Sequence, residues 1–319
     1  MITELVTADI GGTHARFALA QIEDGRVLHL GDALVLRTSD YAGLAHGWRA
    51  FADHLGRPLP RAAALGLAYP VESGLPELTN MPWRIDPRTL PADLDVIQYL
   101  ILNDFCAIGH ATATLGSAHF SRIAGPDIPL PENGVISIVG PGSGLGVGLV
   151  AKKDGQFQVI ASEGGNMDFS PNDDLDDRLM AALRRRYSHV SAERVISGPA
   201  LMDIYAVIAG AQPPYSDDRN LWQAAFEGRD PIAAASLERF CVCLGAFAGN
   251  IALAHGAKAL VLAGGLGLRL REHLSASGFA RALTAKGEYR ALMEQLPVKL
   301  IIHPEPGLYG AAAAFASRV

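Results

Sequence analysis

Several features that would assign a chain quickly to a class are missing from this sequence. Its 319 residues carry 27 Lys and Arg against 33 Asp and Glu, a formal net charge of −6, and the longest basic run is residues 184–186. That run lies in a helical pattern, so we expect it on a solvated helix face. The charge balance provides no attraction for phosphate backbones, so we expect no nucleic-acid partner.

Cysteines and targeting segments are equally scarce. The three cysteines are Cys106, Cys241 and Cys243, an odd number at spacings that fit neither a disulfide framework nor a four-ligand zinc site. The N-terminus lacks the basic and apolar regions of a signal peptide. The uncharged stretch 240–257 contains Asn, His and several glycines, so it predicts a buried core helix rather than a membrane span. We therefore expect a cytoplasmic protein that does not bind a membrane.

The familiar nucleotide motifs are absent as well. No segment matches G-x-x-x-x-G-K-[ST], and the glycine clusters at 140–148 and 264–267 never give G-x-G-x-x-G. The sequence thus gives no support to a P-loop NTPase or a dinucleotide-dependent dehydrogenase.

What is present is a large apolar fraction arranged as an α/β pattern. Hydrophobic residues make up 49% of the chain, and the length suggests two domains of about 150 residues each. Apolar runs predict buried strands, and amphipathic or apolar segments between them predict helices. The strands are expected at 63–71, 95–104, 257–265 and 298–304, and two of the helices at 173–187 and 304–318.

Two segments of the chain repeat each other without a gap. Residues 9–26 match residues 139–156 in the type, order and spacing of two turns. The pattern predicts strand, glycine turn, strand, Asp-Gly hairpin and strand, twice. The match favours duplication or convergent repetition, and a coincidence of two ordinary hairpins stays open. The matched positions are Gly12 with Gly142, Thr13 with Ser143, Asp24-Gly25 with Asp154-Gly155, and Asp9 with the non-acidic Val139.

The repeated glycine turns suggest a common ligand. Backbone N–H groups in such turns can form an anion-binding concavity, and the hydroxyls of Thr13 and Ser143 add donors. Either turn alone could be a simple tight hairpin. Two of them together favour binding of a polyphosphate.

Six motifs in order carry a resemblance to a known family: ADIGGTHARF, LILNDF, GPGSGLG, EGGNMDF, HVSAERVISGP and LAGGLG. Together they resemble bacterial glucokinases of the hexokinase and actin-like ATPase superfamily, over essentially the whole chain. The cysteine-rich zinc motif of ROK sugar kinases is missing. The resemblance implies an α/β, two-domain actin-like ATPase (ribonuclease H-like) fold with a cleft between the domains. The smaller domain is expected at 1–114 plus 305–319 and the larger at 115–304.

The resemblance also implies an activity and its cofactors. It indicates ATP- and Mg²⁺-dependent phosphorylation of glucose at the 6-hydroxyl, the first step of glycolysis, by a homodimer. Asp9 is expected near the Mg²⁺, through water. The residues that the resemblance assigns to ATP are Asp9, Gly11, Gly12, Thr13, Gly142, Ser143, Gly144, Gly264 and Gly265.

A second set of residues is assigned to the hexose. A sugar hydroxyl both donates and accepts hydrogen bonds, so carboxylates and amides suit it. The resemblance also makes Asp104 the general base, and its position just after a buried strand, at the edge where α/β sheets open a cleft, suits that role. The sugar-binding residues implied by the resemblance are Asn103, Asp104, Glu163, Asn166 and Glu193.

Each of these positions also has a purely structural interpretation. Asp104 could be the N-cap of the helix that follows it. Glu193 could belong to a capping box or lie on a solvated helix face. Arg16 could be a phosphate-side charge or a strand-edge charge. Trp83 and its neighbours Thr79 and Asn80 could line the sugar site or form an ordinary loop packed by Trp.

Histidines outside the motifs are simpler to interpret. For His14, His110 and His189 we expect hydrogen-bonded structural roles rather than catalytic ones.

Asn166 departs from the family pattern, which usually has His in the EGGNMDF segment. Asn keeps an acceptor and two donors, but it is shorter and does not titrate near neutral pH. Glucose use could be tolerated with a bridging water, sugar preference could shift, or activity could be lost. A kinase for another hexose, a non-catalytic sugar-sensing protein and an actin-like ATPase without a sugar substrate remain alternatives.

Overall fold

The computed structural model describes residues 2–67, 83 and 85–319. It divides into two compact units, which are described separately. Unit 1 comprises Met1–Leu115 and His303–Val319, and unit 2 comprises Gly116–Ile302. The domain limits expected from the resemblance, 114/115 and 304/305, lie one and two residues from these unit limits and remain a prediction.

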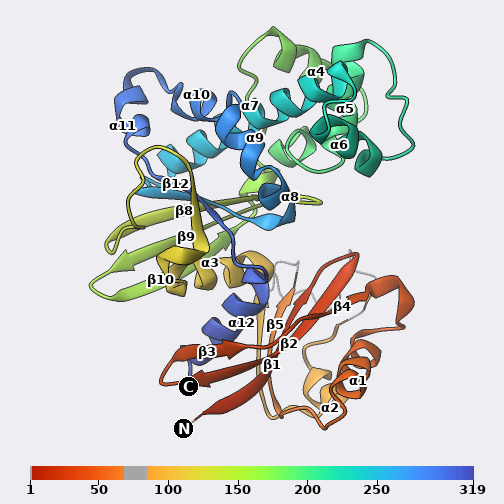
Figure 1. Ribbon diagram of the computed structural model, residues 1–319, viewed down its shortest axis with the longest axis vertical. Helices are drawn as coiled ribbons and strands as arrows, with labels where there is room; N and C mark the ends of the chain where they lie inside the picture. The colour runs from red at the N-terminus through yellow and green to blue at the C-terminus, as the bar shows by residue number, and fades with distance from the viewer. Residues whose placement is uncertain (1, 68–82, 84) are drawn as a thin grey trace. The chain divides into compact units, whose positions relative to one another are not determined.

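Unit 1 is a mixed sheet with helices on both faces (Figure 1). The strand order is β3-β2-β1-β5-β6, with β4 also paired to β2. β1 is antiparallel to β2 and parallel to β5, which is parallel to β6. The elements are β1 (Thr3–Ile10), β2 (His14–Glu23), β3 (Arg26–Leu30), β4 (Leu34–Arg37), η1 (Thr38–Asp40), α1 (Leu44–Leu55), β5 (Ala62–Leu67), α2 (Leu90–Leu94), β6 (Gln98–Asn103), α3 (Asp104–Thr114) and α12 (Pro306–Ala316).

Two separate cores explain why this sheet is apolar on both faces. Every residue of β5 is buried, as expected for a central parallel strand covered on both sides. On one face α1 and α2 pack over an aromatic cluster in which the rings of Phe17 and Phe51 stack at 5.8 Å. On the other face α3 and α12 pack closely through small side chains, including Ala107 and Ala311.

Unit 2 contains a second mixed sheet with the order β10-β9-β8-β11-β12-β7. One large core joins β8, β9, β11 and β12 to helices α4 to α10. The elements are η3 (Ser117–His119), β7 (Phe120–Ala124), β8 (Gly134–Pro141), β9 (Leu145–Lys153), β10 (Gln156–Ser162), η4 (Gly164–Asn166), α4 (Asp174–Arg184), η5 (Ala192–Arg194), α5 (Ala200–Ala209), α6 (Asp218–Phe226), α7 (Pro231–Ala254), β11 (Ala259–Leu262), α8 (Gly264–Arg269), α9 (Arg271–Ala276), α10 (Phe279–Thr284), η6 (Gly287–Tyr289), α11 (Arg290–Glu294) and β12 (Val298–Ile301).

Helix α7 contains most of the uncharged stretch that the sequence assigned to a core helix. Asp230 caps its first turn, and Pro231 occupies the start, where no N–H is needed. The hydroxyls of Tyr205 and Tyr215 donate to the same Asp230 carboxylate, at 3.0 and 2.9 Å. Among the described residues α7 alone has the length and hydropathy of a membrane span, but 67% of that window is buried inside the structure. The prediction of a core helix is confirmed.

The internal repeat is confirmed in the backbone. Each copy is two antiparallel pairs, β1-β2-β3 and β8-β9-β10. The second turn of each copy has positive φ at both central residues, 49° and 74° at Asp24-Gly25 and 52° and 78° at Asp154-Gly155. Positive φ at both positions is typical of a type I′ hairpin, which Asp-Gly favours.

The first turn of the repeat differs by one residue between the copies. In β1-β2 the last pair is Ile10 with Ala15, whereas in β8-β9 it is Pro141 with Leu145. The alignment without a gap is therefore shifted by one residue for the positions that precede this turn. By ladder register the position equivalent to Asp9 is Gly140 rather than Val139, and it is still not acidic.

The predicted strands and helices are found, with shifted ends. The strand expected at 95–104 is β6, which ends one residue earlier because Asp104 already begins α3. The strand expected at 63–71 is β5, and residues 68–71 lie outside the described residues. The helices expected at 173–187 and 304–318 are α4 and α12.

Unit 1 should lose stability in mild acid because of His110 in α3. Burial, and secondarily the charge of Arg318, lowers the pKa of His110 from 6.5 to about 4. As pH falls below 6.5 the unfolded chain therefore gains a proton before the folded chain does. We expect the unfolding free energy to fall by about 2 kcal/mol between pH 7 and pH 5. His110→Gln should remove this part of the pH dependence in urea titrations, and an identical slope for both proteins would contradict it.

Candidate functional site

The first glycine loop, residues 11–14, is held from behind by Thr38. The carbonyl of Gly12 accepts from the Thr38 hydroxyl at 2.9 Å, and the carbonyl of Thr13 accepts from the Thr38 N–H at 3.1 Å. The described peptide bonds are trans, so the N–H of Thr13 points away from Thr38, opposite to the Gly12 carbonyl. Gly12 and Thr13 are exposed. The loop can therefore offer a backbone donor and a hydroxyl to an anion.

Trp83 supports this loop from the core. Its side chain is 1% exposed, and its indole N–H lies 2.8 Å from the Thr38 carbonyl and 3.0 Å from the Tyr41 carbonyl. Trp83 is thus a core residue that fixes Thr38, which matches the interpretation of a loop packed by Trp. Thr79 and Asn80 lie outside the described residues.

Asp9 lies at the end of β1, next to the first glycine loop. Arg16, its partner in the β1-β2 ladder, places a guanidinium nitrogen 3.7 Å from the Asp9 carboxylate and another 3.5 Å from Glu305. The Asp9 carboxylate also lies against Gly307, where a Cβ would approach one of its oxygens to 2.8 Å. Arg16 therefore joins two carboxylates of unit 1, a role that sequence reasoning could not decide.

The electrostatics of this cluster fit a cation that is shared with a ligand. Burial raises the pKa of Asp9 and Arg16 opposes that shift; burial likewise raises the pKa of Glu305. Among the described residues, no group of three or more His, Cys, Asp or Glu could hold a metal ion by itself. One or two carboxylates plus phosphates and water is the arrangement that Mg²⁺ commonly adopts, so Asp9 fits it.

Asn103 and Asp104 lie where β6 ends and α3 begins. Asn103 is the N-cap: its side-chain oxygen accepts from the N–H groups of Phe105 at 2.7 Å and Cys106 at 3.2 Å. The alternative interpretation of Asp104 as the N-cap is therefore wrong. Asp104 is the first helical residue, and one of its oxygens accepts from the Phe105 N–H at 2.9 Å. The helix N-terminus stabilises a negative charge there, which a general base requires.

In unit 2 the second glycine loop, residues 142–144, is held in the same manner as the first. The Gly142 carbonyl accepts from the Gly198 N–H at 2.7 Å, and the Gly198 carbonyl accepts from the buried Trp222 indole at 2.8 Å. In the trans peptide after Gly142, the N–H of Ser143 points away from Gly198. Ser143 is exposed, so this loop too can offer a backbone N–H and a hydroxyl.

Glu193 is bonded to the end of this loop. Its carboxylate accepts from the N–H of Leu145 at 3.0 Å, and a Cβ on Gly144 would lie 2.5 Å from the same oxygen. Gly144 must therefore remain glycine for this approach. Glu193 lies in the short helix η5 and is partly buried, so neither the capping box nor the solvated helix face describes it.

The LAGG segment contacts Pro141, the residue just before the second glycine loop, from the neighbouring strand. Gly264 follows β11 with φ of 85°, and a Cβ there would lie 2.8 Å from the carbonyl oxygen of Pro141. β11 pairs with β8 in parallel, so the carboxyl ends of both strands meet at one edge. The structure thus brings together, within unit 2, three of the segments assigned to ATP and hexose.

The EGGNMD loop, residues 163–168, packs against β9, the strand that follows the second glycine loop. A Cβ on Gly165 would overlap with the carbonyl oxygen of Leu145, and one on Gly164 would lie 3.0 Å from Val147. The two glycines thus allow the backbone to touch the strand. Glu163 and Asn166 on either side of them are exposed, and the Asn166 amide lies 3.4 Å from the Glu163 carboxylate.

Backbone pairing places this loop beside η5. The Ala192 N–H donates to the Met167 carbonyl at 2.8 Å, and the Phe169 N–H donates to the Val190 carbonyl at 3.2 Å. Because η4 and η5 are adjacent, the segment that carries Glu163 and the segment that carries Glu193 lie side by side. Unit 2 therefore gathers its predicted sugar residues, Glu163, Asn166 and Glu193, in one region.

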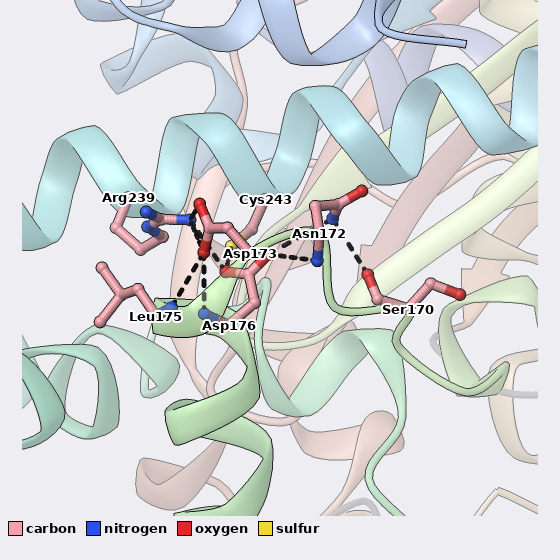
Figure 2. A network of polar contacts seen from close by, with 7 residues as sticks. All are labelled: Ser170, Asn172, Asp173, Leu175, Asp176, Arg239 and Cys243. Atoms are coloured by element: carbon pink, nitrogen blue, oxygen red, sulfur yellow. Dashed lines mark hydrogen bonds and ion pairs between the residues drawn. The ribbon is translucent and has the colours of Figure 1, made fainter. Parts of the chain in front are cut away.

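A buried ionic network anchors the chain just after the EGGNMD loop (Figure 2). Asp176 is fully buried, and one carboxylate oxygen lies 3.1 Å from Arg239 of α7 and 3.5 Å from the Cys243 thiol. Burial raises the pKa of Cys243 well above its usual value, so the thiol stays protonated and can donate. The other oxygen of Asp176 accepts from the backbone and the side chain of Asn172.

Sequence reasoning missed several of these contacts. Gly198 lies in the HVSAERVISGP motif, yet nothing local shows that it holds the Gly142 carbonyl. Glu305 could have been suspected only from its place before the Pro-Gly that opens α12. The link between Glu193 and Leu145 spans 48 positions, so no spacing rule reveals it.

Comparisons with known proteins agree with this architecture. The glucokinase from an Antarctic psychrotroph has a solved structure with a TM-score of 0.82, 31% identity and coverage of 98% of both chains. A ROK-family glucokinase from Streptomyces griseus has a TM-score of 0.64, covers 98% of this chain and 99% of its own, and at 20% identity shows the fold alone. The two-sheet α/β fold is therefore that of the sugar kinases of the actin-like ATPase class.

The family follows from sequence. A family model described as Glucokinase matches residues 6–318, and the Glucokinase of Zymomonas mobilis is 49% identical over 318 residues, 99% of this chain and 98% of that protein. The chain belongs to the glucokinase family, whose members use ATP as a substrate. The resemblance drawn from the six motifs is confirmed.

Proposed function

We propose that this chain transfers the γ-phosphoryl group of ATP to the 6-hydroxyl of glucose, giving glucose 6-phosphate and ADP. The observation that carries the proposal is the bond between Glu193 and the N–H of Leu145, directly after the second glycine loop. It joins a carboxylate suited to sugar hydroxyls with a loop suited to phosphates. Family membership supports the same reaction.

Asp104 is the proposed general base. It accepts the proton of the 6-hydroxyl as that oxygen attacks the γ-phosphorus, and ADP leaves with the electrons of the broken P–O bond. Asn103 fixes the start of α3 and hence the position of this carboxylate. Asn103, Glu163, Asn166 and Glu193 are the proposed contacts to the other hydroxyls.

The two glycine loops are the proposed phosphate site. Thr13 and Ser143 donate through backbone and side chain, and Gly264 and Gly265 lie beneath the adenosine. Mg²⁺, held by Asp9 through water, would neutralise phosphate charge. Phosphoryl transfer needs mainly positioning and charge neutralisation, and loops of N–H donors provide both.

We further propose the domain limits 1–114 plus 305–319 and 115–304, a homodimer, and a cytoplasmic location without membrane or nucleic-acid partners. The charge of −6 supports the absence of a nucleic-acid partner, and the buried position of α7 supports the absence of a membrane partner. Sedimentation of the full chain tests the homodimer.

A coupled ADP-release assay tests the activity across glucose, mannose, fructose and glucosamine, with and without Mg²⁺. We expect Mg²⁺-dependent ADP release with glucose. Folded protein that releases no ADP with any sugar overturns the proposal. Sugar binding by calorimetry without ADP release identifies a sugar sensor instead, and ADP release without sugar identifies an ATPase. The order of the four sugars decides whether Asn166 preserves or shifts sugar preference.

A further inference from the structure

His189 links the two ends of the exposed part of the EGGNMD loop. Its Nε2 lies 2.8 Å from the backbone carbonyl oxygen of Asn166, and its Nδ1 lies 3.1 Å from a carboxylate oxygen of Asp168. The side chain comes from the segment just before η5, so it bridges the two strands of chain that carry Glu163 and Glu193.

The chemistry of the two partners fixes what the ring must do. A backbone carbonyl only accepts, so Nε2 must carry the proton that bonds Asn166. The Asp168 carboxylate lies beside the other ring nitrogen, so it orients the ring from the opposite side. The bond at Asn166 is the one that reaches the proposed sugar contacts.

The rest of the loop shows why this bond matters. Gly164 and Gly165 are fixed against β9, and Met167 is fixed by the Ala192 N–H. The N–H of Asn166 is bonded to the Glu163 carbonyl at 2.9 Å. The carbonyl of Asn166 is oriented by His189. Both backbone polar groups of Asn166 are therefore bonded, which fixes the residue whose side-chain amide lies beside Glu163.

We propose that His189 is a positioning residue for hexose recognition. It orients the Asn166 peptide, and through it the pair of Asn166 and Glu163 that faces the sugar. Asp168 orients the ring in turn. This inference rests on the proposed function, in which Asn166 and Glu163 contact the hexose.

Three substitutions separate positioning from mere packing. In His189→Gln the amide nitrogen reaches about where Nε2 lies, so the donor to Asn166 is kept. In His189→Asn the amide nitrogen lies nearer the position of Nδ1, so the donor to Asn166 is lost. Both lose the ring equally, which makes them a matched pair. His189→Ala removes the ring and with it both contacts.

The measurements are KM for glucose, KM for ATP and kcat in the coupled assay, with thermal unfolding of each variant. We expect KM for glucose to rise about 3- to 10-fold in His189→Asn and His189→Ala, the effect of one lost hydrogen bond. His189→Gln should stay within about two-fold of the parent. KM for ATP and kcat should stay unchanged in all three.

Equal effects of Gln and Asn, or an unchanged KM for glucose in both Asn and Ala variants, overturn the inference. If the Ala variant fails to fold, the matched pair of Gln and Asn still decides. A parent protein that neither binds a hexose nor releases ADP overturns the proposed function and this inference together. An active parent with indifferent variants overturns the inference alone.

Discussion

Asp104→Asn is expected to lower kcat for glucose phosphorylation by about 10²- to 10⁴-fold while glucose still binds. An amide cannot take up the proton of the attacking hydroxyl, but it can still hydrogen-bond to it. The fold should survive because Asn103, not Asp104, caps α3, and the new side-chain oxygen can accept from the Phe105 N–H. The coupled ADP assay and glucose calorimetry measure the two effects separately.

Asp93→Asn is the matched control for this substitution. Asp93 is an exposed acid in the first turn of α2, also in unit 1, where it accepts from the Thr89 hydroxyl at 2.8 Å. Its activity should stay within about two-fold of the parent because it lies outside the assigned site. ADP release by Asp104→Asn at the rate of this control would show that another group takes the proton.

Asp176→Ala is expected to lower the free energy of unfolding by about 3–5 kcal/mol. Asp176 is fully buried, and the Arg239 side chain is 16% exposed. Removing the Asp176 carboxylate leaves Arg239 with only the half-exposed Asp173 as a carboxylate partner in this network. The backbone N–H of Asn172 loses its acceptor at the same time. Urea denaturation followed by tryptophan fluorescence measures the change.

Two comparisons make this test specific. Arg290→Ala breaks the exposed pair between Arg290 and Glu294, and it should change stability by less than about 0.5 kcal/mol. The double variant Asp176→Leu with Arg239→Met removes both charges, so it should recover part of the loss. A loss below about 1 kcal/mol in Asp176→Ala would mean that the network does not hold α4 to α7.

Local signals in the sequence were enough to predict much of the fold. Asp24-Gly25 and Asp154-Gly155 specify hairpin turns by themselves, because few other pairs accept positive φ twice. The apolar run that became β5 needed only its composition to be assigned as a buried strand. The six motifs contain both glycine loops, Asp104 and the EGGNMD loop.

The parts that sequence could not provide depend on contacts between distant residues. Asn103 and Asp104 are both good capping residues, and only the φ and ψ angles at the end of β6 show which of them is the cap. The start of α4 is acidic, and only the structure shows that Asp176, unlike the acids beside it, is buried against α7. The role of Glu193 could not be inferred from its own segment, because its partner, Leu145, lies on β9, 48 positions away.

Leu145 lies between the proposed sugar residues and the second glycine loop, so it is a point through which the two substrates can influence each other. Its N–H is held by Glu193 on the sugar side, its carbonyl touches Gly165 of the EGGNMD loop, and it directly follows the second glycine loop. Under the proposed function, a hexose that engages Glu193 contacts the same carboxylate that holds Leu145, the residue after the second glycine loop. Thermodynamic linkage then makes the coupling reciprocal: glucose changes the affinity for ATP by the factor by which ATP changes the affinity for glucose.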